Sequence, residues 1–152
     1  MKWRLVDRIL AWEPRRRICG IKNVSFEEYE LKRSLGEEPC LPESLLVESL
    51  FQLGNWLVIL SSDFTRMGLI LRVEEVCFLE RLRPGGCLEM DVQVCSWRDD
   101  GLLFDGQARS RDRLLATGRG CLALPVPLEE FQNPDDLRVL LSEIYRPESA
   151  SS

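Results

Sequence analysis

A single acidic side chain inside an apolar segment is the most distinctive chemical feature of this sequence. Glu48 lies in the run 45–60, where Gln52 and Asn55 follow it and Ser44 precedes it. At helical spacing these four polar side chains project from one face. A carboxylate among apolar residues is costly unless it is paired, hydrated or used in a reaction. Glu48 is therefore the first candidate for acid–base chemistry.

The same polar line has a simpler interpretation. Glu, Gln and Asn at helical intervals also mark the solvated side of an ordinary amphipathic helix. The helical wheel alone leaves both interpretations open, because it does not say what covers that face.

Residue types that the chain lacks restrict the chemistry further. The 152 residues include no histidine, which excludes histidine metal ligands and every histidine-based acid–base mechanism within the chain. The six cysteines are scattered without a C-x-x-C pair, mainly in apolar contexts. We expect them to be small hydrophobic side chains in a reducing compartment, and we expect no metal site. They are Cys19, Cys40, Cys77, Cys87, Cys95 and Cys121.

Length and composition predict an ordinary soluble domain. A chain of 152 residues is long enough for one domain that buries about 70% of its unfolded surface. The net charge of −5 does not suggest a nucleic-acid partner. Asp7 and Arg8 interrupt the first apolar run, so no secretory signal is expected, and the polar residues of 45–60 argue against a membrane span. We expect a cytoplasmic protein with one domain at 1–146 and a flexible tail at 147–152.

The element that must position Glu48 is predicted to be one long helix over 39–62. Pro39 and Pro42 lead into it, and Pro42 suits the first turn, where its missing N–H needs no partner. Apolar residues cover most of the wheel, which predicts a helix enclosed by other structure. Gly68 is a plausible cap at its C-terminal end.

The remaining segments favour strands and one more helix. Runs 5–12 and 18–24 predict a strand or helical turn and then a strand, and 69–78, 88–97, 102–110 and 114–124 predict four more strands. Asp99-Asp100-Gly101 is a hairpin signal, and Gly118 with Gly120 hints at a bulge. Asn133 is expected to cap a helix that runs to Tyr145. A curved antiparallel sheet wrapped around one central helix, an α+β arrangement, satisfies this order.

That arrangement resembles the hotdog fold, and three segments resemble the β-hydroxyacyl-acyl carrier protein dehydratases. P-C-L-P-E-S-L-L-V-E-S-L-F-Q is similar to that family's helix entry, G-H-F-P-x-x-P-x-x-P-G-x-L-x-x-E-x-x-x-Q. R-L-V-D-R-I-L at 4–10 is similar to its N-terminal L-V-D-R, and F-L-E-R-L-R-P-G-G-C-L at 78–88 to F-x-x-x-V-x-P-G-D-x-L. The likeness covers roughly 5–124.

The resemblance implies removal of water from a 3-hydroxyacyl chain on a phosphopantetheine arm, without another cofactor. It also implies a site at the interface of a dimer, or of a trimer of dimers. Glu48 matches the family's helix carboxylate and Gln52 its glutamine, whereas Ser34 occupies the position of the catalytic histidine. Glu43 replaces the glycine that begins the helix, and with Pro42 and Ser44 it is expected to contact substrate.

The departure at Ser34 separates three hypotheses. A positioned general base contributes about 10²–10⁴-fold, and a serine without a histidine partner cannot replace it. The first hypothesis is a protein that binds acyl thioesters or an acyl carrier protein, with dehydratase activity lost or weak, and that can pair with an active homologue. The second is an acyl-thioester hydrolase or dehydratase relying on Glu48 alone. The third is a scaffold whose pocket is filled by Phe51, Trp56 and Phe64.

Charged loops and strand edges suggest partners. Arg15, Arg16 and Arg17 with Arg111 and Arg113 are candidates for contact with an acidic carrier protein, although solvated loop arginines would look the same. Pairing of a strand edge across a homodimer would remove an open edge.

Overall fold

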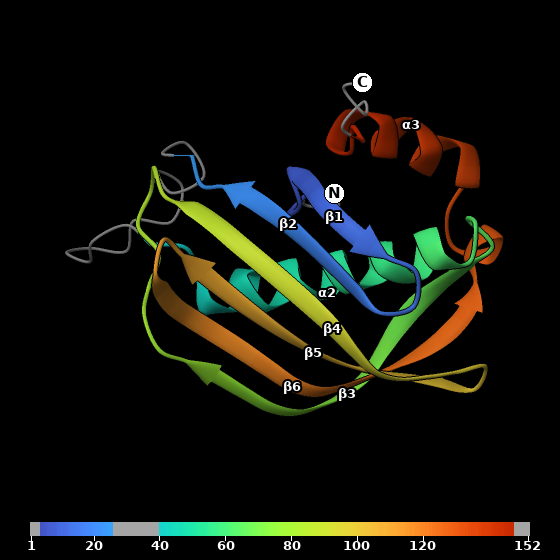
Figure 1. Ribbon diagram of the computed structural model, residues 1–152, viewed down its shortest axis with the longest axis horizontal. Coiled ribbons are helices and arrows are strands. Elements are labelled where there is room, and N and C mark those ends of the chain that lie inside the picture. The colour runs from blue at the N-terminus through green and yellow to red at the C-terminus, as the bar shows by residue number, and fades with distance from the viewer. Residues whose placement is uncertain (1–3, 26–39, 148–152) are drawn as a thin grey trace, which may run out of the picture.

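Six antiparallel strands curve around a long helix in the computed structural model, which describes residues 4–25 and 40–147 (Figure 1). The strands are β1 (Arg8–Glu13), β2 (Arg17–Asn23), β3 (Arg66–Phe78), β4 (Cys87–Arg98), β5 (Gly101–Ser110) and β6 (Arg113–Pro127). The helices are α2 (Glu43–Ser61), the 3-10 turn η1 (Leu128–Glu130) and α3 (Pro134–Ile144). Within the described residues the sheet order is β1-β2-β4-β5-β6-β3, so β1 and β3 are its edges. The predicted α+β hotdog architecture is confirmed.

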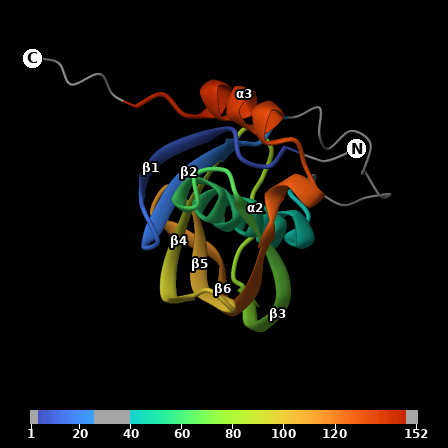
Figure 2. The same ribbon diagram turned by 90° about the vertical axis from the view of Figure 1, so that its right-hand side faces the viewer.

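Helix α2 packs one face into the concave side of the sheet (Figure 2). Leu46, Leu50 and Leu53 are at most 2% exposed on that face. Gly54 lets Phe104 of β5 approach closely, since a Cβ at Gly54 would lie only 3.1 Å from the Phe104 ring. The predicted helix is therefore correct in type, and it begins at Glu43, directly after Pro42.

Most apolar residues of α2 are buried as predicted, whereas its polar line is not covered by the sheet. Leu45, Gln52 and Asn55 are half-buried and Glu48 is exposed, so one stripe of the helix is left uncovered by the sheet. By length and composition α2 would also suffice to cross a membrane, but half of its apolar window is buried inside the protein. Core helices of soluble proteins commonly meet the same criterion, so this is weak evidence for a span, and a cytoplasmic location stays a prediction.

The strands follow the predicted alternation. Leu88, Met90 and Val92 of β4 are at most 2% exposed and face the core, while Glu89 between them points outward. β4 and β5 are joined at Asp99 and Asp100 by the predicted hairpin turn. The predicted irregularity in β6 is also present. The pairing register of β5 with β6 shifts beside Gly120, which adopts a φ of 62°.

The prediction that Gly68 caps α2 is wrong. The helix ends at Ser61, and the chain then turns through Asp63 and Phe64, with φ values of 52° and 60°. Asp tolerates this left-handed region, and Phe64 is held there by burial. Gly68 lies inside β3, where its N–H donates to the Asn55 side chain at 2.8 Å.

Helix α3 lies on the same side of the sheet as α2, next to β1 (Figures 1 and 2). Asn133 caps it as predicted, accepting a hydrogen bond from the Asp135 N–H at 2.9 Å, and Pro134 occupies the first turn. The Arg4 guanidinium pairs with Glu143 at 3.1 Å and so ties the N-terminal segment to α3. This packing places α3 beside the uncovered stripe of α2.

Candidate functional site

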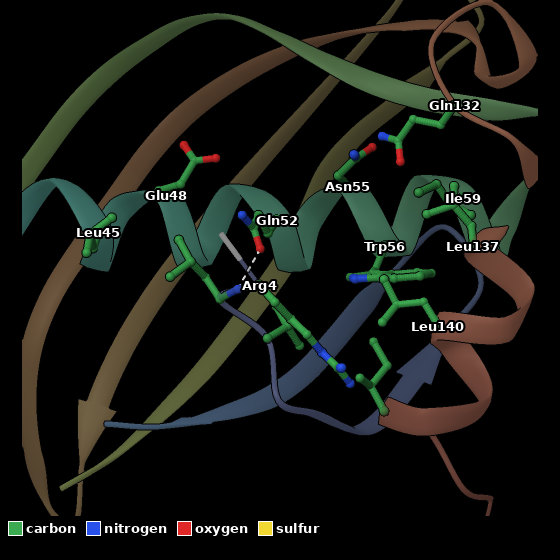
Figure 3. A pocket seen from close by; sticks show the side chains of 13 residues that line it. Arg4, Leu45, Glu48, Gln52, Asn55, Trp56, Ile59, Gln132, Leu137 and Leu140 are labelled. Atoms are coloured by element: carbon green, nitrogen blue, oxygen red, sulfur yellow. Dashed lines mark hydrogen bonds between the residues drawn. The ribbon is translucent and has the colours of Figure 1, made fainter. Parts of the chain in front are cut away.

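A cavity of about 430 Å³ lies between the uncovered stripe of α2, the N-terminal segment and α3 (Figure 3). Its volume falls in the range of small-molecule sites. We call it the α2–α3 cavity. Its lining residues are Arg4, Leu5, Val6, Leu45, Glu48, Gln52, Asn55, Trp56, Ile59, Gln132, Leu137, Leu140 and Ile144.

The predicted polar line of α2 forms part of this wall, but its members have different roles. The Gln52 Oε1 atom accepts a hydrogen bond from the Leu5 N–H at 2.9 Å, and the Asn55 Oδ1 atom accepts from the Gly68 N–H at 2.8 Å. Each amide oxygen thus satisfies a backbone N–H donor. Gln52 and Asn55 therefore fix the N-terminal segment and β3 against α2.

Glu48 is the side chain of the cavity that is available for acid–base chemistry. Among residues 4–25 and 40–147, no side chain or backbone group forms an ion pair or hydrogen bond with its carboxylate. Arg4 lines the same cavity, but Glu143 engages its guanidinium. The Glu48 carboxylate is exposed to solvent in the protomer, so it is open to a ligand or to water.

The other predicted site residues of the helix entry lie outside the α2–α3 cavity. Pro42, Glu43 and Ser44 form the N-terminal end of α2, about one turn before Glu48. The Glu43 N–H belongs to the first turn, whose backbone donors have no acceptor within the helix. Ser34 lies outside the described residues.

The aromatic residues do not fill the space beside Glu48. Trp56 lines the cavity and is 7% exposed, whereas Phe51 and Phe64 are absent from its wall. The open volume next to Glu48 argues against a scaffold with a closed pocket.

The five arginines predicted to contact a carrier protein divide into two groups. The Arg15 N–H donates to Ser61 Oγ at 3.0 Å, which places the β1–β2 turn at the C-terminal end of α2. Arg111 and Arg113 instead line a second, more open cavity with Cys40, close to the N-terminal end of α2. Figure 1 shows these two turns at opposite ends of the sheet. The arginines therefore do not form one patch.

The second cavity also includes cationic residues that sequence reasoning missed. Arg81 and Arg83 lie on its wall beside Arg111 and Arg113, and Arg113 pairs with Glu80 at 3.5 Å. The R-L-R spacing before Pro84 could have indicated that Arg81 and Arg83 lie together, because alternate residues of an extended segment share a side. No group of three metal-ligating side chains occurs in the described part of the chain.

A comparison with known protein families shows which family this chain belongs to. Residues 1–117 match the FabA-like domain. The chain belongs to the FabA-like family. The predicted family resemblance is thereby confirmed, and α3 of this FabA-like protein lies beyond the matched residues.

Individual relatives agree with this membership. The chain is 32% identical over 114 residues to the 3-hydroxyacyl-[acyl-carrier-protein] dehydratase FabZ of Caldanaerobacter subterraneus, covering 74% of this chain and 81% of the relative. It is 30% identical over 121 residues to FabZ of Clostridioides difficile, covering 79% and 85%.

Solved structures with low sequence identity share the fold. A hot-dog-like protein from Thermanaerovibrio acidaminovorans superposes with a TM-score of 0.61 at 18% identity, over 83% of this chain and 89% of that one. Zebra fish thioesterase superfamily member 2 superposes with a TM-score of 0.60 at 13% identity, over 76% and 79%. These likenesses establish the hotdog fold of the FabA-like protein.

Proposed function

We propose that this FabA-like protein binds an acyl thioester on the phosphopantetheine arm of a carrier protein, with dehydratase activity lost or weak. The observation that carries the proposal is Glu48 beside an open cavity of about 430 Å³ in a chain without histidine. The FabZ relatives are named as dehydratases of 3-hydroxyacyl carrier proteins, which supports the ligand class.

The proposed ligand lies with its thioester end near the start of α2. Backbone N–H groups of the first turn carry partial positive charge and favour an electron-rich carbonyl. The side chain of Glu43 adds negative charge there and disfavours an oxyanion. The start of α2, formed by Pro42, Glu43 and Ser44, is therefore suited to binding a thioester. It is less suited to polarising the thioester carbonyl strongly.

Hydrolysis of a thioester is the second candidate function. A single carboxylate can activate water, and the exposed Glu48 carboxylate is accessible to it. Weak dehydration by Glu48 alone belongs to the same class of mechanism. Either reaction requires the carboxylate, whereas binding does not.

The test is to compare the wild type with Ser34→His and Glu48→Gln on a 3-hydroxyacyl thioester and on a saturated acyl thioester. We expect the wild type to bind both and to dehydrate the first only slowly. Ser34→His should raise dehydration by about 10²-fold, and adding Glu48→Gln should remove that gain. Dehydration by the wild type at rates usual for FabZ enzymes would contradict the proposal. Wild-type hydrolysis that disappears in Glu48→Gln would favour the second candidate.

We also propose a homodimer formed through the β3 edge. β3 exposes several large apolar side chains, among them Leu71 at 57% and Phe78 at 40%. Burial of this edge in a second copy would pair its free backbone groups and cover these side chains. Trimers of dimers, and a heteromer in which an active homologue supplies the histidine, are compatible with the same edge.

The proposed carrier-docking surface is the arginine group of the second cavity. Arg81, Arg111 and Arg113 lie near the N-terminal end of α2, where the thioester end of the ligand is placed. Positive charge there would attract an acidic carrier protein even though the whole chain is acidic.

A further inference from the structure

The C-terminal helix α3 lies outside the family match at 1–117, yet it builds one wall of the α2–α3 cavity. Leu137, Leu140 and Ile144 line the cavity at spacings of three and four residues, so they form a single apolar stripe. Leu137 and Ile144 are 8% and 2% exposed. The stripe is thus a packed wall of the cavity.

This wall stands at the end of the cavity away from Glu48. Figure 3 shows Leu137 and Leu140 beside Ile59 and Trp56, whereas Glu48 lies near the other end of the α2 stripe. Trp56 and Ile59 are 7% and 2% exposed. The cavity therefore has a carboxylate at one end and an apolar enclosure at the other.

The distance between the two ends of the α2–α3 cavity corresponds to an acyl chain of medium length. Glu48 and Ile59 are eleven residues apart on α2, which at the helical rise is about 16 Å. The α2 residues of the wall lie along one stripe of the helix, from Leu45 to Ile59. A wall that follows one stripe and carries the only acidic side chain of its described residues, Glu48, near one end suits a linear chain with a polar head.

Contacts at both ends of α3 hold the wall in place. The Arg4–Glu143 ion pair anchors the last turn at 3.1 Å. Near the first turn, the Arg138 guanidinium lies 4.5 Å from the centre of the Phe64 ring, and Asn133 caps the helix. A fixed wall gives the cavity a defined end.

We propose that α3 sets the length of the acyl chain that this protein accepts, because its apolar stripe closes the cavity about 16 Å from Glu48 along α2. The thioester lies between the first turn of α2 and Glu48, and the methyl end lies against Leu137 and Leu140. This inference rests on the proposed function, because it takes an acyl thioester as the ligand of the cavity.

The test compares Leu140→Trp and Leu140→Ala with the control Val139→Trp. Val139 is the adjacent residue of α3 and is 62% exposed, so a tryptophan there adds the same bulk outside the cavity. Butanoyl, octanoyl, dodecanoyl and hexadecanoyl pantetheine are titrated by calorimetry, and thermal unfolding checks that each variant is folded.

For the wild type we expect affinity to rise by about two- to fourfold per added methylene up to dodecanoyl and then to stop rising. Leu140→Trp should weaken dodecanoyl binding by about tenfold or more and leave butanoyl binding unchanged. Leu140→Ala should move the optimum toward hexadecanoyl, and Val139→Trp should match the wild type.

Several outcomes would overturn the inference. Binding of all four thioesters with equal affinity removes the role of α3 while the proposed function stands. Equal effects of Leu140→Trp and Val139→Trp do the same. If Leu140→Trp does not fold, Leu140→Ala decides, and an unchanged optimum rejects the proposal. If the wild type binds no thioester of any length, the proposed function fails together with this inference.

Discussion

At the scale of single residues, Glu48 differs from the neighbours that share its helix face. Gln52 and Asn55 use their side-chain oxygens to satisfy backbone N–H groups of Leu5 and Gly68. Their role is to join elements, so substituting them would disturb structure before chemistry. Glu48 has no comparable structural bond in the described residues, and its carboxylate is accessible. A Glu48→Gln variant is thus a direct test of chemistry, because little of the fold depends on its charge.

The cysteines are a second subject at this scale. All six are free, and only Cys121 is fully buried, so the expectation that they behave as small hydrophobic side chains applies best to this one. Burial, followed by the nearby Asp105 carboxylate, raises the pKa of the Cys121 thiol to about 11.

The raised pKa of Cys121 predicts a specific dependence of stability on pH. The folded state favours the neutral thiol of Cys121. The contribution of this thiol to the free energy of unfolding is therefore complete below the unfolded pKa near 9.0, and it is lost as the pH rises toward about 11. We expect the free energy of unfolding to fall across this window and to fall less steeply in Cys121→Ala. Urea unfolding at several pH values measures both slopes. Equal slopes in the wild type and the variant would contradict this assignment.

At the scale of elements, two hairpin turns carry the arginines that the sequence suggested for carrier binding. Arg15 and Arg111 both have positive φ values, of 59° and 55°, and so occupy similar turn positions. In the part of the chain that the structure describes, Arg16 pairs with Glu13 at 3.9 Å and Arg113 pairs with Glu80 at 3.5 Å. The two turns therefore resemble each other in backbone conformation and in ion pairing, and they differ mainly in their position on the sheet.

We expect charge reversal at the β5–β6 turn to weaken carrier binding. Arg111→Glu combined with Arg113→Glu should lower the affinity for an acidic acyl carrier protein by about tenfold at low salt, with a smaller effect at high salt. The same reversal at Arg15 and Arg16 should change it by less than about twofold, because the β1–β2 turn is remote from the start of α2. Surface plasmon resonance at two salt concentrations distinguishes the turns. Equal losses for both double variants would exclude a specific role for the second cavity.

At the scale of the whole molecule, the two sheet edges differ in how they can be covered. β1 is a short edge of 6 residues, whereas β3 is a long edge of 13 residues with exposed apolar side chains. A long apolar edge is a liability in an isolated protomer. The β3 edge is therefore the better candidate for the interface with a second copy.

Leu71→Glu should shift the protein from dimer to monomer, because the carboxylate would have to be buried at the interface without a partner. Leu10→Glu is the matched control, since Leu10 on β1 is 51% exposed and Leu71 is 57% exposed. Sedimentation velocity over a range of protein concentrations reports the assembly state. A Leu71→Glu protein that remains dimeric, or a Leu10→Glu protein that dissociates, would place the interface elsewhere.

The local patterns of the chain predicted much of this molecule. Alternation in β4, the Asp99–Asp100 hairpin and the Asn133 cap depend on neighbours in sequence, so each was recognisable before folding. The prediction that Gly68 caps α2 was wrong because a glycine after an apolar run has the sequence pattern of a helix C-cap. The helix instead ends where burial of Phe64 sustains a left-handed turn, and burial depends on the rest of the fold.

The sequence by itself determined which groups are available for chemistry: the Glu48 carboxylate, two amides in line with it, and no histidine anywhere in the chain. Helical periodicity places those side chains on one face, but it carries no information about which distant segment covers that face. Only the tertiary structure decided that α3 and the N-terminal segment enclose one end of the stripe, and that the arginines divide between opposite ends of the sheet. Contacts between residues far apart in the chain depend on packing of whole elements, which spacing along the sequence does not encode.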